Sequence, residues 1–177
     1  DMSSEGDLTG IVSEFVYDRL KNYFAEYGIS AAQFEAVANV SHDSLPDFNQ
    51  RLLAIGEFAK LPEASALAAA NKRIGNILKK SDIDATEKVS EDLLQEQAEE
   101  DLWHAIKNIE QSNAPKLQAR DYVGVLQALA GLRSPVDAFF DAVMVNAEDA
   151  NVRANRLALL RKIAGQLNAV GDISLLA

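Results

Sequence analysis

The chain has 177 residues, 48% of them hydrophobic, no cysteine and a formal net charge of −10. This length suffices for one large or two small domains with a core that needs no covalent cross-link. The lack of cysteine excludes disulfides and thiolate metal sites, and the negative charge argues against nucleic-acid binding by overall charge alone. Apolar runs are short and broken by charges, so we expect no membrane span and no signal peptide, and a cytoplasmic protein.

The spacing of apolar residues predicts eight helices. In the first half they cover residues 8–27, 30–37, 45–59 and 63–80. Gly28 is placed to end the first in a left-handed conformation, and Ser30 with Gln33 forms a capping box that opens the second. Pro46 suits the first turn of the third. Residues 1–7 show no periodicity, so we expect a flexible end there and one helical domain over residues 8–177.

The second half predicts four more helices. They cover the stretch from Thr86 or Ser90 to Gln111, then 117–132, then Pro135 through Val143, and 148–170. The sequence Asn113-Ala114-Pro115 is expected to break the chain between the first two. No alternating strand pattern and no long repeat occurs, so the predicted class is all-α, a bundle of about seven to eight helices.

The sequence predicts neither a catalytic residue nor a metal site. His42 and Asp43 could both be metal ligands, but His104 is the only other histidine and lies far along the chain. There is no glycine-rich phosphate loop and no cysteine nucleophile. The acidic run Glu96, Glu99, Glu100 and Asp101 predicts a solvated helix face.

The last helix carries arginines at its apolar stripe. On a helical wheel Arg156 falls inside the stripe and Arg153 at its edge. A buried guanidinium needs a partner, so Arg156 is interpreted as an ion pair with Asp137 or Asp141, or as a contact to an RNA phosphate or base. Arg153, nearer the open end of the helix, is the better RNA candidate.

The helix over residues 63–80 carries four cations. Arg73 and Lys80 lie on one flank of its apolar stripe, and Lys72 and Lys79 lie on the other. Lys79 and Lys80 can also be explained by the negative helix end, whereas the two mid-helix cations cannot. Asn71 beside them could bond a base edge or a backbone carbonyl.

Three sequence strings together resemble a known family. They are A-L-A-A-A-N-K-R-I-G-N-I-L-K-K at 66–80, S-P-V-D-A-F-F-D-A-V-M-V at 134–145 and V-R-A-N-R-L-A-L-L-R-K-I at 152–163. With F-V-Y-D-R-L-K-N-Y from Phe15 and D-I-S-L-L from Asp172, they resemble the C-terminal anticodon-binding, DALR-like domain of glycine-tRNA ligase (glycyl-tRNA synthetase) beta subunits. The residue after Val145 is Asn146, where the family pattern has a methionine.

The resemblance implies a tRNA anticodon recognition module of an aminoacyl-tRNA synthetase. The partners would be the anticodon stem-loop of glycine tRNA and the alpha subunit of an α2β2 heterotetramer, with no DNA or membrane. ATP and Mg²⁺ would be used by the catalytic alpha subunit, so this chain would hold no cofactor. The alternative is a helical interaction domain that docks the alpha subunit or the rest of beta. The RNA-binding residues expected from the resemblance are Asn71, Lys72, Arg73, Lys79, Arg153, Asn155 and Arg156.

Overall fold

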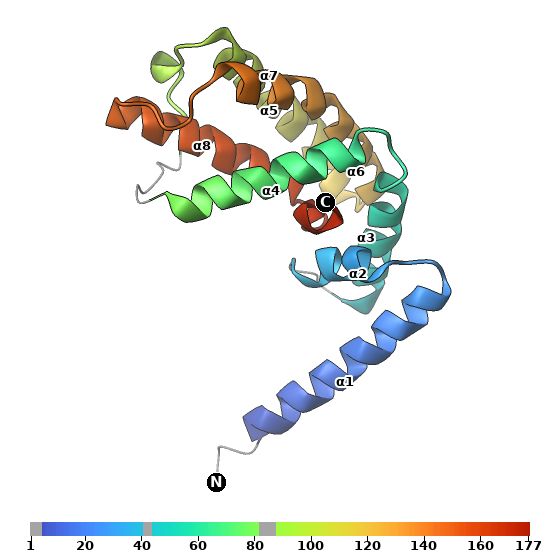
Figure 1. Ribbon diagram of the computed structural model, residues 1–177. Coiled ribbons are helices and arrows are strands. Elements are labelled where there is room, and N and C mark those ends of the chain that lie inside the picture. Colours follow the sequence, from blue (N-terminus) through green and yellow to red (C-terminus); the bar gives the residue numbers. More distant parts are fainter. Residues whose placement is uncertain (1–4, 41–43, 82–87) are drawn as a thin grey trace.

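The computed structural model describes the backbone of residues 5–40, 44–81 and 88–177, and side chains in these ranges from Val16 onward. Within them the chain forms eight α-helices and three short 3₁₀ helices and contains no strand, which confirms the all-α class (Figure 1). The α-helices are α1 (Glu5–Glu26), α2 (Ala31–Ala38), α3 (Leu45–Phe58), α4 (Ala64–Lys80), α5 (Gln97–Gln118), α6 (Tyr122–Leu129), α7 (Arg133–Ala142) and α8 (Ala150–Leu167). The 3₁₀ helices are η1 (Glu91–Leu93), η2 (Ala130–Leu132) and η3 (Ile173–Leu176).

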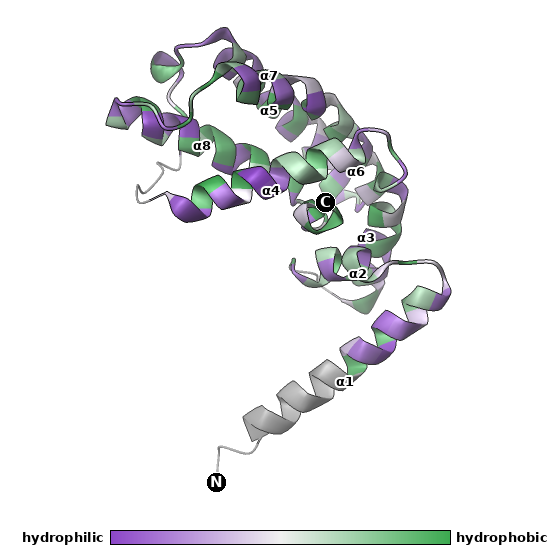
Figure 2. Ribbon diagram, in the orientation of Figure 1, coloured by the Kyte–Doolittle hydropathy of each residue, from purple (hydrophilic) through white to green (hydrophobic). Residues whose placement is uncertain are grey.

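Helix α8 is the central element of the bundle. Every residue from Asn155 to Leu160 is buried, so α8 is covered on all sides rather than on one face. It packs against α4 and α5, with α6 and η1 in further contact. Figure 2 shows hydrophobic residues along its inner part and hydrophilic ones at its N-terminal end. Any polar side chain in the covered part must therefore find a partner inside the protein.

Helices α2, α3 and α4 lie within one residue of their predicted ranges, and local signals account for their positions. Gly28, two residues after the end of α1, has a φ of 83°, a conformation that glycine adopts without strain. The Ser30 hydroxyl accepts from the Gln33 backbone N–H, and the Gln33 side chain accepts from the Ser30 N–H, so the capping box is confirmed. Pro46 lies in the first turn of α3. Helix α1 begins at Glu5, earlier than predicted, and projects away from the other helices (Figure 1).

The predicted limits of the fifth helix were wrong at both ends. Thr86 lies outside the described residues, and Ser90 precedes η1 instead of α5. Helix α5 starts at Gln97, where the Glu99 carboxylate accepts from the Glu96 backbone N–H. It then continues through Pro115, because Asn113 is buried and donates to the Val125 carbonyl, which fastens this stretch to α6. Tertiary contacts thus outweigh the loss of one backbone hydrogen bond.

The helix predicted over residues 117–132 is divided. Arg120 adopts a φ of 56°, in the left-handed region, and ends the preceding turn. The Asp121 carboxylate then caps α6 by accepting from the Gly124 N–H. Helix α7 starts at Arg133, directly after η2, and not at the predicted Ser134-Pro135 cap. These turns bring α7 alongside α5 and leave its end near α8.

A buried polar network fixes the C-terminal segment to α3. Asp47 is fully buried and accepts from the Tyr122 hydroxyl and from Arg51, whose Nε lies 2.8 Å away. Arg51 also donates to the Ala169 and Val170 carbonyls at 3.1 and 3.2 Å. At Gly171 a Cβ would lie 3.2 Å from the Ala36 carbonyl oxygen, so glycine permits this close approach.

Candidate nucleic-acid interface

Helix α4 presents its four cations on two opposite flanks of the buried face. Arg73 and Lys80 share one flank, and Lys72 and Lys79 share the other. All four side chains are exposed. The flank of Arg73 and Lys80 meets α7 and the start of α8, as described below.

Arg73 lies against α7. Its guanidinium carbon is 4.0 Å from the centroid of the Phe140 ring, a cation–π contact. The contact holds the long side chain against the helix while leaving it exposed to solvent. Arg73 therefore places a positive charge, held by one ring contact and open to solvent, on the same flank of α4 as Lys80.

A hollow of about 700 Å³ lies between the end of α4 and the start of α8. We call it the α4–α8 hollow. It is lined by Ile77, Lys80 and Ser81 of the α4 end, Val145 and Asn146 of the α7–α8 connection, and Arg153 and Leu157 of α8. Two cations thus share the lining of one hollow with three apolar side chains, at the end of the molecule where Figure 2 shows hydrophilic residues on both helices.

Arg153 also organises the α7–α8 connection. Its Nη1 donates to the carbonyl of Ala147 and, at 3.3 Å, to that of Glu148. The Asp149 carboxylate caps α8 by accepting from the Asn151 and Val152 N–H groups. Because both Arg153 bonds use the same nitrogen, the other donors of its guanidinium remain available to a ligand. The predicted RNA-contact candidate therefore lines a hollow in a fixed geometry.

Arg156 has a different partner from either predicted one. Its Nε and Nη2 lie 2.9 and 3.1 Å from the two Glu99 carboxylate oxygens, a bidentate pair. Its Nη1 donates to the Met144 carbonyl at 2.8 Å. Asp137 instead lies 3.7 Å from Arg133. Arg156 is buried and occupied inside the protein, so its predicted contact with RNA does not fit this structure.

Glu99 is accordingly not part of a solvated acidic face, as predicted, but is fully buried. Burial alone would raise the pKa of its carboxyl. Hydrogen bonds from Arg156 and from the Gln95 and Glu96 N–H groups outweigh that effect and hold the pKa below its ordinary value. The carboxylate therefore stays charged and fixes α5, α8 and the α7–α8 connection together.

Two predicted base-reading amides are also inside the protein. Asn71 is buried and donates to the Asn168 side-chain oxygen at 2.8 Å. Asn155 is buried and exchanges two hydrogen bonds with the Ser90 backbone, at 2.7 and 3.0 Å. Both amides are buried and hydrogen-bonded to groups of the protein, so direct contact of either with a base does not fit the structure.

The structure adds two residues to those the sequence proposed for RNA contact. The first is Lys80. From the sequence, this lysine was explained by the negative charge at the end of the helix, but its spacing of seven residues from Arg73 was a signal that the two share a flank. Asn146 lies in the hollow with an exposed side chain. Its only sequence signal was its departure from the methionine of the family pattern.

The described residues contain no group of three or more histidine, cysteine or acidic side chains placed to hold a metal ion. His42 and Asp43 lie outside the described residues. Among the helices of the described part, none has the length and apolar character that crossing a membrane requires.

Comparison with known proteins gives a family match over most of the chain. The DALR anticodon binding domain matches residues 67–173, which include most of α4, the hollow and α8. The chain is also similar to proteins called glycine--tRNA ligase beta subunit. It is 49% identical to that of Nitrosomonas europaea over 96% of this chain and 24% of that protein. It is 51% identical to that of Xanthomonas campestris pv. campestris over 90% and 23%, and 49% identical to that of Pseudomonas aeruginosa over 99% and 26%. The chain therefore spans about a quarter of the length of these curated relatives.

Proposed function

This chain belongs to the DALR anticodon binding domain family, and we propose that it recognises the anticodon of glycine tRNA within a glycine-tRNA ligase beta subunit. Its role is RNA binding, and the attachment of glycine takes place in another part of the ligase. The similarity to three glycine--tRNA ligase beta subunits over nine-tenths or more of this chain supports this assignment.

The observation that carries the proposal is the convergence of Lys80 and Arg153 on one hollow. These side chains come from helices far apart in the sequence, and the buried pair of Arg156 with Glu99 keeps the helix that carries Arg153 in place. Neither cation has an ion-pair partner among the described residues. Cations without an ion-pair partner can bind phosphates without first losing an ion pair.

The binding mode follows from charge. Lys80 and Arg153 contact phosphates of the loop, and Arg73 extends the positive flank along α4. Lys72 and Lys79, on the opposite flank, contact phosphates of the adjoining stem. The net charge of −10 repels RNA elsewhere, so binding is weak and sensitive to salt.

Filter binding of the chain to glycine tRNA at two salt concentrations tests this function. Lys80→Ala should lower the affinity and reduce the steepness of the salt dependence, by about 0.7 for each phosphate that is no longer neutralised. The matched control is Lys60→Ala. Lys60 lies just after the end of α3, is exposed, and forms an ion pair with Glu57 of that helix. Equal affinity for a tRNA with a substituted anticodon would reject anticodon recognition.

The complete enzyme lies beyond this chain. We propose an α2β2 heterotetramer in the cytoplasm, in which the alpha subunit uses ATP and Mg²⁺ for the attachment of glycine. The relatives' designation as beta subunits supports an alpha partner. Native mass spectrometry of the complete ligase tests the stoichiometry, and a mass other than two alpha and two beta subunits would reject it.

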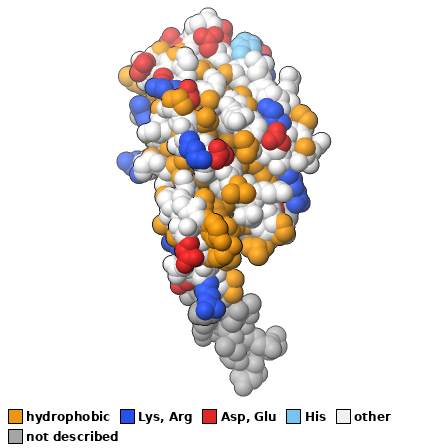
Figure 3. Space-filling model, turned by 90° about the vertical axis from the view of Figure 1, so that its right-hand side faces the viewer, with side chains coloured by type: hydrophobic (Ala, Val, Ile, Leu, Met, Phe, Trp, Pro, Cys, Tyr) orange, Lys and Arg blue, Asp and Glu red, His pale blue; other side chains and the backbone are white. Residues whose placement is uncertain are grey.

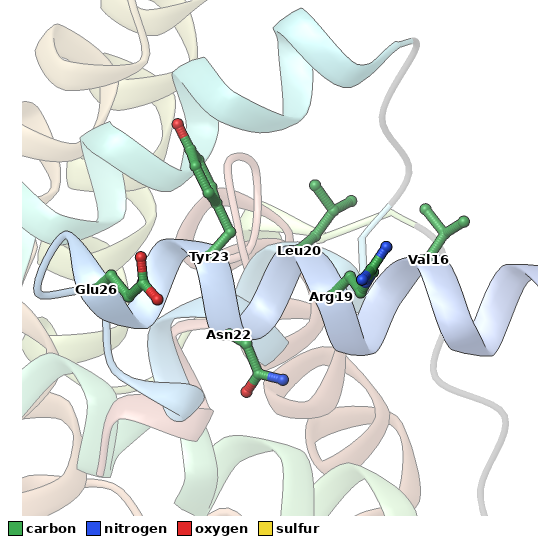
Figure 4. Close-up of a pocket in the computed structure, with 6 residues that line it drawn as sticks. All are labelled: Val16, Arg19, Leu20, Asn22, Tyr23 and Glu26. Carbon is green, nitrogen blue, oxygen red and sulfur yellow. The ribbon is translucent and has the colours of Figure 1, made fainter.

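A second surface favours an additional docking role. Hydrophobic residues of α1, of the connection after it and of α3 line a groove of about 590 Å³, with Tyr27 69% exposed and Leu45 and Leu53 57% and 56% exposed. Figure 3 shows hydrophobic side chains gathered on the lower part of the described surface. In Figure 4, the side chains of Leu20 and Tyr23 point to the same side of α1, and that of Asn22 points to the opposite side. Exposed apolar area of this kind is typical of an interaction surface.

We propose that the rest of the beta subunit covers this groove, since the matched segment is only 24% of the Nitrosomonas protein. Hydrogen exchange tests this role. Amides of residues 45–53 should exchange more slowly in the complete ligase than in this chain alone. Equal exchange rates would reject it.

A further inference from the structure

The α4–α8 hollow has features that phosphate binding alone does not require. Ile77, Val145 and Leu157 contribute apolar side chains to its lining. A site for phosphate alone would need only donors and positive charge. Its volume of about 700 Å³ lies within the range of about 300–1,000 Å³ found for sites that enclose small organic ligands. The hollow is therefore built for a ligand with an apolar face as well as a charge.

Asn146 gives the hollow a group that can distinguish one base from another. Its amide has one acceptor oxygen and two donor hydrogens on a rigid plane, the combination that pairs with the edge of a nucleobase. The side chain is exposed in the hollow and makes no hydrogen bond with the described residues. By contrast, the amides of Asn71 and Asn155 are bound within the protein.

The backbone beside Asn146 is held on both sides. Arg156 donates to the Met144 carbonyl, and Arg153 donates to the carbonyls of Ala147 and Glu148. The two arginines thus fasten the α7–α8 connection before and after Asn146. An amide on such a held connection reads a base with less loss of conformational entropy than one on a free loop.

We propose that the α4–α8 hollow takes one unpaired nucleotide of an RNA loop. Its base rests on Ile77, Val145 and Leu157, its edge pairs with the Asn146 amide, and its phosphate lies between Lys80 and Arg153. This inference rests on the proposed function and adds to it which residue reads a base. Unpaired loop bases are accessible to such contacts, whereas paired bases in an RNA helix are not.

The test is a cycle of protein and RNA changes, measured as affinity by fluorescence anisotropy. The RNA is the anticodon stem-loop of glycine tRNA, intact or with an abasic site at one loop position at a time. With the unchanged chain, one abasic position should lower affinity at least about five-fold, as expected for loss of a paired base edge. With Asn146→Ala, the intact RNA should bind more weakly, and the abasic change at that position should have a smaller effect than with the unchanged chain, because only the contact of the base with the apolar lining remains to be lost.

The matched control is Asn108→Ala, which removes an exposed amide from α5, a helix that does not line the hollow. It should retain the full effect of the abasic change. A free mononucleotide is the second arm, and it should bind far more weakly than the loop because it lacks the neighbouring phosphates.

The outcomes separate this inference from the function it rests on. If the RNA binds with anticodon dependence but Asn146→Ala leaves every abasic effect unchanged, the inference is wrong and the function stands. If the RNA binds without anticodon dependence or not at all, both are wrong. Tighter binding of the mononucleotide than of the loop would also overturn the inference.

Discussion

Replacing Arg156 by methionine removes the cation from the most buried of the ion pairs in the described part of the chain. Methionine keeps much of the length and apolar character of the side chain, so the change tests charge and hydrogen bonding more than packing. Glu99 would then be a carboxylate that is fully buried without its partner. The three hydrogen bonds of Arg156, at 2.9 and 3.1 Å to Glu99 and 2.8 Å to the Met144 carbonyl, would disappear together.

The expected cost is large. Removing one partner of a buried ion pair destabilises a protein by about 3–5 kcal/mol. For a domain of this size, each kcal/mol shifts the melting temperature by about 2–4 °C, which gives a decrease of about 6–20 °C. The control is Arg133→Met, because the Arg133–Asp137 pair is exposed and such pairs contribute about 0–1 kcal/mol.

Thermal unfolding followed by circular dichroism measures both changes. The double variant Glu99→Met with Arg156→Met should recover at least half of the loss, since a buried pair replaced by apolar residues is often neutral in stability. The reasoning is refuted if Arg156→Met costs less than about 1 kcal/mol, or if the double variant is as unstable as the sum of the two single variants.

Three further predictions concern the same region. Because the pKa of Glu99 is lowered in the folded state, its stabilising effect is present above the ordinary value of 4.5 and is lost as the pH falls through the lower folded value. The melting temperature of the unchanged chain should therefore fall more steeply below pH 4.5 than that of Glu99→Gln, and parallel profiles would contradict this. Asn155→Ala should cost about 1–3 kcal/mol in urea denaturation, because it leaves the Ser90 backbone groups without partners; a cost near zero would show that water replaces the amide. Lys72→Ala should weaken binding of glycine tRNA less than Lys80→Ala does, and equal effects in anisotropy measurements would argue against the hollow as the main contact.

Signals that act over a few residues were predictable from the sequence. The capping box of Ser30 and Gln33 and the left-handed Gly28 depend only on near neighbours, and both are confirmed. The apolar spacing of α4 likewise predicted its limits to within one residue. In each case the physical cause lies within one or two helical turns.

Contacts between distant segments were not predictable in the same way. Glu99 lies 57 positions from Arg156, and a wheel of α8 shows only that the arginine needs a partner, not which acid supplies it. Asn71 forms a hydrogen bond with Asn168, which lies 97 positions later in the chain, so its burial could not be predicted from the sequence of α4 alone. The local pattern predicts a break at Pro115 because it does not contain the contact of Asn113 with α6.

The same limit applies to the candidate site. Arg153 was predicted from its place near the open end of α8, whereas Asn146 became a candidate only when the fold placed the α7–α8 connection beside the end of α4. Asn146 lies in a connection between helices, where no periodic pattern marks which side chains face the hollow.

The most direct test of the central claim is a titration of the isotope-labelled chain with the anticodon stem-loop of glycine tRNA, followed by NMR. We expect the largest backbone shifts at the α4–α8 hollow, around Ser81, Asn146 and Arg153, and weaker ones with a stem-loop of substituted anticodon. Shifts confined to the groove of α1 and α3, or equal shifts with both RNAs, would contradict the claim that this hollow reads the anticodon loop.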